Sequence, residues 1–259
     1  MSSGDVSHVS SRDNPLLKEL RKLAHDPGAY RKAGRVWLEG DHLCRAARER
    51  GVRPAVAIFA ESLWASAQHE WRDVAPRTVV VADALLAGAS GLESPAPMGF
   101  LLELPPPSDI VPDAPTVVLD RLQDAGNVGS ILRSASAFGF FQVIALKGTA
   151  ALWAPKVLRA GMGAHFGLRL VEGADQGALD RLSLPLIATS SHRGDWLHRA
   201  DLPFPCAWLM GHEGRGVSAE LEARASWHVR IAQPGGEESL NVAAAAAICL
   251  HASAAAAGA

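Results

Sequence analysis

The chain has 259 residues, of which 48% are hydrophobic and 20% charged, and its formal net charge is −2. These values indicate one large or two ordinary globular domains, and they exclude a disordered chain and one that is basic throughout. The three cysteines, Cys44, Cys206 and Cys249, are far apart in the sequence. Their number and spacing predict the reduced, mostly buried thiols of a cytosolic protein, with neither a disulfide framework nor a zinc site.

The two ends of the chain carry no targeting pattern. The first ten residues lack the basic start and the apolar centre of a signal peptide. Residues 242–259 are rich in alanine and include a histidine, so they fall short of the ~20 strongly apolar residues of a membrane span. We therefore expect a cytoplasmic protein without membrane contact, and a buried helix at the C-terminal end.

Residues 1–107 predict a small α/β domain. Asn14 and Pro15 form a typical helix start, and leucines at helical spacing follow them to residue 24. A second helix is expected at 41–51, with Asp41 as its cap and Gly51 at its end. Short apolar strands are predicted at 35–40, 55–60, 77–83 and 99–104.

The front of this domain is locally basic. Residues 12–53 contain 11 Lys or Arg and 6 Asp or Glu, a balance of +5. Such a surface suits contact with phosphates, although a solvated helix face would have the same composition.

Residues 104–115 separate this region from the rest of the chain. They contain five prolines, which fit neither a helix nor a central strand, and we interpret them as a linker before a second domain at 116–259. There, apolar runs at 116–120, 141–148, 184–191, 205–211 and 227–233 are typical of strands covered on both faces. Helices are predicted at 128–138, 153–160, 175–182, 218–224 and from 241 onward. The alternation predicts an α/β domain with a mostly parallel sheet.

Ligands of such sheets bind beyond the carboxyl ends of the strands, where three glycine-rich polar loops occur. In the first loop, Asn127 is suited to cap a helix that begins at Val128. Val128, Ile131, Leu132 and Ala135 then form an apolar stripe toward the sheet. Arg133 points away from that stripe, on the face of the small residues Gly129 and Ala137. The space beside it would suit a phosphate or another bound oxygen, although an ordinary surface arginine has the same signature.

The other two loops surround acidic and amide side chains. Glu213 stands between glycines in the second loop, where glycine lets backbone amides approach a ligand closely. Ser239 and Asn241 open the last helix, and either is suited to cap it. The glycine spacing fits neither a dinucleotide fingerprint nor a P-loop.

Taken in order, these loops resemble the three motifs of the SpoU or TrmH-type RNA 2′-O-ribose methyltransferases of the SPOUT superfamily. The matching segments read "LDRLQDAGNVGSILRSASAFG", "WLMGHEGRGVS" and "VRIAQPGGEESLNVAAAAA". The front segments "SRDNPLLKELRKL" and "YRKAGRVWLEGDHLCRA" are similar to the L30e/L7Ae-like substrate-binding domain of that family. Ala125 departs from the family pattern, which has proline there, and Ala232 and Gln233 replace its Pro-Met pair.

The resemblance implies a C-terminal trefoil knot, a homodimer and S-adenosylmethionine as the methyl donor. The histidines are scattered without ligand spacing, so we expect no metal. It implies donor contacts at Gly211, Ile231 and Leu240, with Leu209 and Met210 as neighbours. It implies catalytic roles for Asn127, Arg133, Glu213, Ser239 and Asn241. Because an arginine normally keeps its proton, we expect Arg133 to hold a phosphate and to stabilise the developing alkoxide. Glu213 would orient Arg133, accept a proton or stabilise its loop.

The front domain would select the RNA. We expect contacts from its basic residues, namely Lys18, Arg21, Lys22, Arg31 and Lys32, with Tyr30 either stacking on a base or lying in the core. The resemblance favours 23S ribosomal RNA over transfer RNA. Two further hypotheses remain at this point, a non-catalytic RNA-binding or ribosome-assembly factor on the same fold and an unrelated nucleotide-dependent enzyme such as an oxidoreductase.

Overall fold

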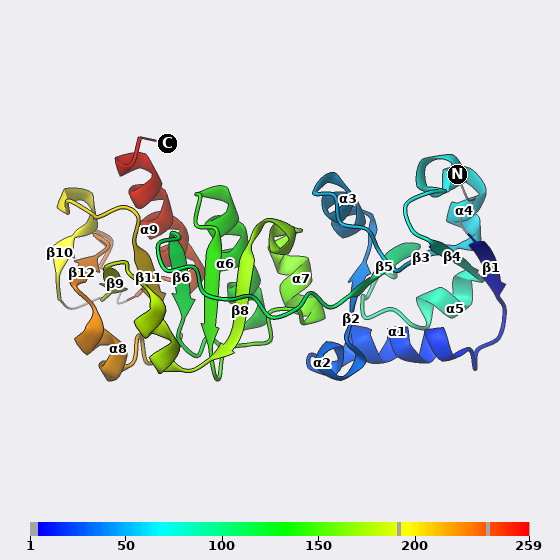
Figure 1. Ribbon diagram of the computed structural model, residues 1–259, viewed down its shortest axis with the longest axis horizontal. Helices are drawn as coiled ribbons and strands as arrows, with labels where there is room; N and C mark the ends of the chain where they lie inside the picture. Colours follow the sequence, from blue (N-terminus) through cyan, green and yellow to red (C-terminus); the bar gives the residue numbers. More distant parts are fainter. Residues whose placement is uncertain (1–4, 191–192, 237–238, 259) are drawn as a thin grey trace. The chain divides into compact units, whose positions relative to one another are not determined.

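The computed structural model describes residues 5–190, 193–236 and 239–258 of the chain, which divides into two compact units (Figure 1). The first unit contains Met1–Pro106 together with Trp153–Phe166, and the second contains Pro107–Leu152 and Gly167–Ala259. Residues 153–166 therefore belong to the first unit, although the chain on either side of them belongs to the second.

The described part of the first unit contains one five-stranded sheet. Its strands are β1 (Asp5–Val9), β2 (Arg35–Glu39), β3 (Val56–Ala60), β4 (Arg77–Val81) and β5 (Met98–Glu103), in the order β1-β4-β3-β5-β2. Strand β5 runs antiparallel to β2 and β3, whereas β4 is parallel to β1 and β3. The helices are α1 (Pro15–His25), α2 (Ala29–Ala33), α3 (Asp41–Glu49), α4 (Glu61–Trp71), α5 (Asp83–Ala87) and α7 (Pro155–Gly161), followed by the 3-10 turn η1 (Ala164–Gly167).

The local signals of this unit explain most of its elements. Helix α1 begins as expected, because the Asn14 side chain accepts a hydrogen bond from the Leu16 N–H at 2.9 Å and Pro15 occupies the first turn. The expected cap at Asp41 was wrong. Gly40, with φ of 104°, precedes the helix, and the Asp41 carboxylate instead accepts from Arg45 Nε at 2.8 Å. Sequence reasoning did not find β1, α2, α4 or α5.

The second unit contains a sheet of seven described strands, and every recorded pairing in it is parallel. The strands are β6 (Thr116–Leu119), β7 (Gln142–Leu146), β8 (Arg169–Ala174), β9 (Leu186–Thr189), β10 (Asp195–Trp196), β11 (Ala207–Met210) and β12 (Trp227–Arg230). Their order is β10-β12-β9-β11-β6-β7-β8. The expected mostly parallel α/β sheet is confirmed, and β8 and β10 are strands that the sequence pattern did not predict.

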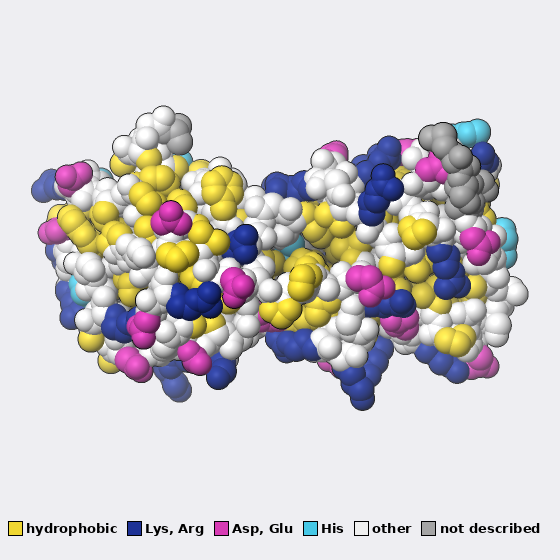
Figure 2. All heavy atoms as spheres, viewed as in Figure 1, with side chains coloured by type: hydrophobic (Ala, Val, Ile, Leu, Met, Phe, Trp, Pro, Cys, Tyr) yellow, Lys and Arg dark blue, Asp and Glu magenta, His cyan; other side chains and the backbone are white. Residues whose placement is uncertain are grey.

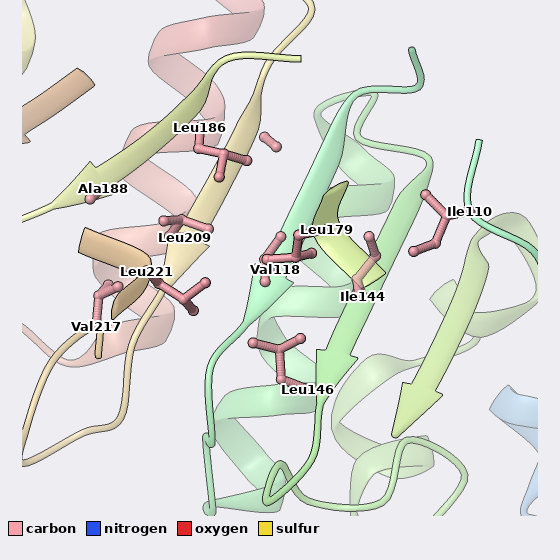
Figure 3. Packing of buried hydrophobic residues seen from close by; sticks show 11 residues of the cluster. Ile110, Val118, Ile144, Leu146, Leu179, Leu186, Ala188, Leu209, Val217 and Leu221 are labelled. Carbon is pink, nitrogen blue, oxygen red and sulfur yellow. The ribbon is translucent and has the colours of Figure 1, made fainter. Parts of the chain in front are cut away.

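Helices cover both faces of this sheet. They are α6 (Ala125–Ala137), α8 (Ala219–Arg224) and α9 (Val242–Ala256), with 3-10 segments η2 (Gln176–Arg181) and η3 (Leu197–Arg199). Because side chains alternate along a strand, Val118, Ile144 and Leu209 point to one face, where they pack in one cluster with Leu179 of η2 and Leu221 of α8 (Figure 3). The residue expected to begin a helix at 175 instead caps a 3-10 turn, since the Asp175 side chain accepts from Ala178 N–H.

The opposite face packs against α6 and α9. Trp208 of β11 is fully buried, and its indole N–H donates to Ser253 Oγ of α9 at 2.9 Å. This bond satisfies a polar atom that would otherwise be unpaired in the core. The apolar stripe expected on α6, from Val128 to Ala135, is fully buried as well.

The three cysteines are free and buried, as expected. Burial raises the pKa of the Cys206 thiol to about 11, against a smaller lowering by its hydrogen bond with Ser253. On the surface, Lys and Arg side chains are interspersed with Asp and Glu over the visible face of both units (Figure 2). Within the described residues, every helix is too short or too polar to span a bilayer.

Candidate functional site

A buried aspartate joins the ends of two central strands in the second unit. Asp120 follows β6, and its backbone N–H donates to the carbonyl of Met210, the last residue of β11, at 2.8 Å. Its carboxylate, which is fully buried, accepts from the Ser218 N–H at 2.7 Å and from the Arg121 guanidinium at 2.9 Å. The loop after β6 is therefore fixed against the loop after β11.

A chain of side-chain hydrogen bonds joins the three loops that the sequence singled out. Asn127 Nδ2 donates to Glu213 Oε1 at 3.2 Å, and Asn241 Nδ2 donates to Asn127 Oδ1 at 2.9 Å. The Asn241 Oδ1 atom accepts from the N–H groups of Ala243 and Ala244, so it caps α9. Residues separated by 114 positions in the sequence thus contact each other directly.

Asn127 is available for this role because it does not cap its own helix. The expected helix start at Val128 was wrong, since α6 begins at Ala125 and Asp124 is its N-cap. The Asp124 side chain accepts from the Asn127 N–H at 2.8 Å, which satisfies a backbone donor of the first turn. The amide side chain of Asn127 is then free to bridge Glu213 and Asn241.

Glu213 is held as a carboxylate by several donors. Partial burial would raise the pKa of its carboxyl group, but hydrogen bonds from its own backbone, from Asn127 and from the N–H groups of Asp124 and Gln123 together lower that pKa below its usual value. The two backbone donors lie 3.2 and 3.4 Å from the carboxylate oxygens. Glu213 therefore joins the second loop to the start of α6, and it makes no recorded contact with Arg133.

The loop from Gly211 to Ser218 is a tight turn that only glycine permits at its base. A Cβ atom at Gly211 would lie 2.1 Å from the backbone of Gly216 and of Val217. Backbone hydrogen bonds of 3.0 and 2.8 Å close the turn between His212 and Gly216, whose φ is +66°. Glycine is therefore required at Gly211 for one part of the backbone to approach another, whereas the predicted close approach of backbone amides to a ligand stays a prediction.

A cleft of about 1110 Å³ opens beside this turn. Among the residues predicted for the site, its wall includes Gly211, Glu213, Ile231, Ser239, Leu240 and Asn241. The wall also contains residues that sequence reasoning missed, among them Thr189, Ser190, His212, Val217 and Glu222. Thr189 and Ser190 come from the end of strand β9 and Glu222 from α8, where no local motif marks them, whereas His212 and Val217 lie within the second loop motif.

Four other predicted residues do not line the cleft. One of them is Asn127, which forms hydrogen bonds with Glu213 and Asn241 of the wall. Leu209 and Met210 are fully buried within β11, directly before Gly211. Arg133 is exposed on α6, and no described residue forms a hydrogen bond or ion pair with its side chain. Ala137 beside it is exposed and Gly129 is buried, so solvent reaches only one side of the expected space.

The basic residues predicted to bind RNA lie on α1 and α2 of the first unit. Lys18 pairs with Asp13 at 3.3 Å, and Arg21 Nε donates to the carbonyl of Gly88 at 3.1 Å. Tyr30 is buried with 3% of its surface exposed, which places it in the core, and the Arg31 guanidinium lies 5.0 Å from its ring centre. Lys32 is exposed and Lys22 is also on the helix surface.

Metal ligands do not cluster in the part of the chain that the structure describes, where no group of three or more His, Cys, Asp or Glu residues could hold an ion.

Comparison with known proteins shows the family to which this chain belongs. The sequence pattern of the SpoU rRNA methylase family matches residues 114–251. An uncharacterized tRNA/rRNA methyltransferase from Synechocystis is 30% identical over 96% of this chain and 94% of its own length. The 23S rRNA (guanosine(2553)-2′-O)-methyltransferase RlmP of Bacillus subtilis is 25% identical over 95% of this chain and 98% of its own. The crystal structure of an AdoMet-bound rRNA methyltransferase from Sinorhizobium meliloti superposes with a TM-score of 0.83, covering 96% of this chain and 98% of that chain at 25% identity.

The chain belongs to the SpoU rRNA methylase family. It is accordingly an S-adenosylmethionine-dependent RNA 2′-O-ribose methyltransferase, and the resemblance read from the three motifs is confirmed.

Proposed function

We propose that this enzyme methylates a ribose 2′-oxygen in structured 23S ribosomal RNA and that the Glu213–Asn127–Asn241 chain organises its site. The observation that carries the proposal is the hydrogen-bonded junction of three loops beside the cleft. RlmP, which matches nearly the whole chain, is named for 23S rRNA, which favours this substrate over transfer RNA. We further propose that the protein acts in the cytoplasm.

The cleft fits the methyl donor. Its wall combines the backbone of a glycine turn, which a Cβ at Gly211 would fill, with the apolar side chains of Val217, Ile231 and Leu240. Apolar walls with a few fixed polar groups suit a flat base attached to a charged amino-acid group. When bound, S-adenosylmethionine supplies an activated methyl group on a sulfonium. Leu209 and Met210 would contribute from behind, by setting the position of Gly211.

The side chains of the site would position the ribose. Asn241 and Asn127 are held by their mutual bond, and Ser239 stands exposed at the rim of the same cleft. Glu213 acts as a fixed acceptor that orders Asn127, because a carboxylate that already accepts several hydrogen bonds is a poor proton acceptor. Positioning of this kind supplies much of the rate of a transfer between two bound reactants.

Arg133 would bind the RNA directly. Its guanidinium has no described partner, so all its donors can meet a phosphate or the alkoxide that develops as the 2′-hydroxyl loses its proton. The α6 surface that carries it also includes exposed Ala137, which leaves room for a strand of RNA.

Further parts of the assignment follow from family membership. We propose that the C-terminal region is knotted, that the first unit selects the RNA through Lys22, Arg31, Lys32 and their neighbours, and that the enzyme works as a homodimer. Two large aliphatic side chains, Leu240 at 38% and Ile248 at 41% exposure, provide apolar surface at the start and on the outer face of α9 for a second subunit.

Methyl transfer from tritiated S-adenosylmethionine to purified rRNA tests the proposal. We expect Arg133→Ala to slow transfer by a factor of about 100 or more and to leave the affinity for S-adenosylhomocysteine within about twofold. Arg181→Ala, which removes an exposed arginine of the same unit, is the matched control. Mapping of ribose methylation in 23S rRNA, 16S rRNA and tRNA from cells with and without the protein then gives the substrate.

Three results would contradict the proposal. Binding of S-adenosylhomocysteine without any methylation would favour a non-catalytic factor. Nicotinamide binding without affinity for S-adenosylhomocysteine would favour an unrelated enzyme. If cells without the protein lacked a ribose methyl group in tRNA alone, the substrate would be tRNA and not 23S rRNA.

A further inference from the structure

An exposed tryptophan is stacked against an arginine at one edge of the second unit's sheet. Strand β10 is an edge strand, and its parallel pairing with β12 places Trp196 opposite Arg230. The Arg230 Cζ atom lies 4.1 Å from the centre of the indole ring. Trp196 nevertheless keeps 38% of its surface exposed, in contrast to Trp208, which is fully buried.

The arginine is fixed in this position but is not neutralised. Its Nε atom donates to the carbonyl of Gly194 at 3.0 Å, and its other N–H groups have no acceptor among the described residues. None of the described carboxylates forms an ion pair with Arg230. The four N–H donors on the two terminal nitrogens of this stacked guanidinium are therefore free to bind oxygen atoms.

The backbone beside the pair is built for close contact. Gly194 has a φ of +101°, and a Cβ atom there would lie 2.1 Å from the carbonyl oxygen of His228. Only glycine lets the turn before β10 approach β12 this closely, and that approach sets the stacking of Trp196 on Arg230. The platform is thus part of the fold and does not depend on two freely moving surface side chains.

Basic and aromatic side chains surround the pair. The rings of Trp196 and His198 lie 6.5 Å apart, and His198 is exposed. Arg193 Nη2 lies 2.8 Å from Glu222 Oε2 and 3.2 Å from His228 Nε2. Asp195 is the acidic neighbour within β10. The surface combines flat rings with guanidinium groups, which are the side chains that hold bases and phosphates in single-stranded nucleic-acid sites.

The platform adjoins the cleft. Ile231, which follows Arg230 directly, lines the cleft, and so does Glu222, the partner of Arg193. An RNA strand whose ribose lies in the cleft can therefore extend over Trp196 within a short stretch of backbone.

We propose that Trp196 and Arg230 form a stacking platform for an unpaired base that neighbours the methylated nucleotide. The platform holds the base by ring stacking and the adjoining phosphate by the free guanidinium donors. This inference rests on the proposed function, because it assigns a second contact to the same RNA. An alternative role for Trp196 is to protect the edge of the sheet from pairing with another chain. A charged residue or a short strand is sufficient for that protection, so it does not explain an exposed indole.

Binding of two RNA probes of equal charge tests the platform without methyl transfer. One probe is a ten-residue oligoadenylate, and the other is its abasic counterpart, which has the same sugar-phosphate chain. Fluorescence anisotropy at fixed low salt gives both dissociation constants. We expect the wild-type enzyme to bind the oligoadenylate about tenfold more tightly, which is the effect of stacking one base.

The variants separate stacking from charge. We expect Trp196→Ala to abolish the preference for bases, Trp196→Phe to keep most of it, and Arg230→Ala to weaken binding of both probes. Phe141→Ala, which removes an aromatic ring that is 59% exposed in the same unit, should change neither constant by more than about twofold.

Three results would overturn the inference. The first is that Trp196→Ala keeps the wild-type preference. The second is that it loses affinity for S-adenosylhomocysteine in parallel, which would place the pair in the donor site. The third is that it changes the oligomeric state, which would make the pair a subunit contact. The tritium assay on rRNA is independent of these probes, so failure of the platform and failure of the proposed methylation are distinguishable.

Discussion

Replacement of Asn127 by aspartate removes the central hydrogen bond of the site while preserving the shape of the side chain. Asn127 Nδ2 donates to Glu213 Oε1 at 3.2 Å, and in Asn127→Asp a carboxylate oxygen takes the place of that donor. Two unit charges at this distance repel by about 1 kcal/mol in a water-like dielectric, which is the appropriate limit because Glu213 is exposed. The new aspartate would still accept the hydrogen bond from Asn241.

The sign of the pH effect follows from the wild-type site. Hydrogen bonding lowers the pKa of Glu213, so its carboxylate, and the junction that it holds, are present above that pKa and lost as the pH falls through it. Repulsion from the introduced carboxylate would raise the pKa of Glu213. The acid limb of the pH–rate profile should therefore move upward by about one pH unit or slightly less.

The fold should tolerate this change. Asn127 is the third residue of α6, and a carboxylate in the first turn interacts favourably with the helix dipole, by roughly 0.3–1 kcal/mol. Thermal unfolding should show a native-like melting temperature, which separates a change in the site from loss of structure.

The assay is the rate of methyl transfer between pH 4 and 8, with the Glu213 carboxyl followed by NMR titration. Ser130→Asp adds the same charge to an exposed position of α6 and is the matched control. Asn127→Ala removes the donor without adding a charge, so its shift should be smaller. The reasoning fails if the acid limb of Asn127→Asp coincides with that of the wild-type enzyme, or if Ser130→Asp moves it equally.

Two further predictions concern the turn and the core. Gly211→Ala should reduce the affinity for S-adenosylhomocysteine at least tenfold, because its Cβ would lie 2.1 Å from the backbone of the turn. Gly214→Ala, whose Cβ would have no atom closer than 3.9 Å, should leave the affinity within about twofold. Isothermal titration calorimetry measures both affinities, and equal effects would disprove the steric argument. Ser253→Ala should lower the free energy of unfolding in urea by about 1–3 kcal/mol, because the buried Trp208 N–H loses its acceptor. In the Ser253→Ala background, Trp208→Phe should lower the free energy of unfolding by less than it does in the wild-type protein. If the effects of the two changes were simply additive, the hydrogen bond between Trp208 and Ser253 would be contradicted.

Local sequence patterns predicted burial and helix caps correctly where a residue's environment is set by its near neighbours in the chain. The leucines of α1 and the stripe from Val128 to Ala135 are buried as their spacing predicts. Asn14 caps α1 for the same reason, since its acceptor and the Leu16 N–H lie two residues apart. The prediction of the N-cap of α6 failed because Asp124 and Asn127, three residues apart, are both suitable caps. The choice of Asp124 depends on Glu213 and Asn241, which bind the Asn127 amide.

By itself the sequence determined the α/β class, the mostly parallel sheet of the second unit and the three loops that carry the chemistry. Short-range spacing encodes these features, and the order of the motifs identifies the family. The tertiary structure alone decided that Asp120 holds the turn at Ser218, that Glu213 contacts Asn127 and not Arg133, and that Trp196 stacks on Arg230. These contacts join residues 34 to 98 positions apart, and such distances are set by strand order and register, which no local spacing specifies.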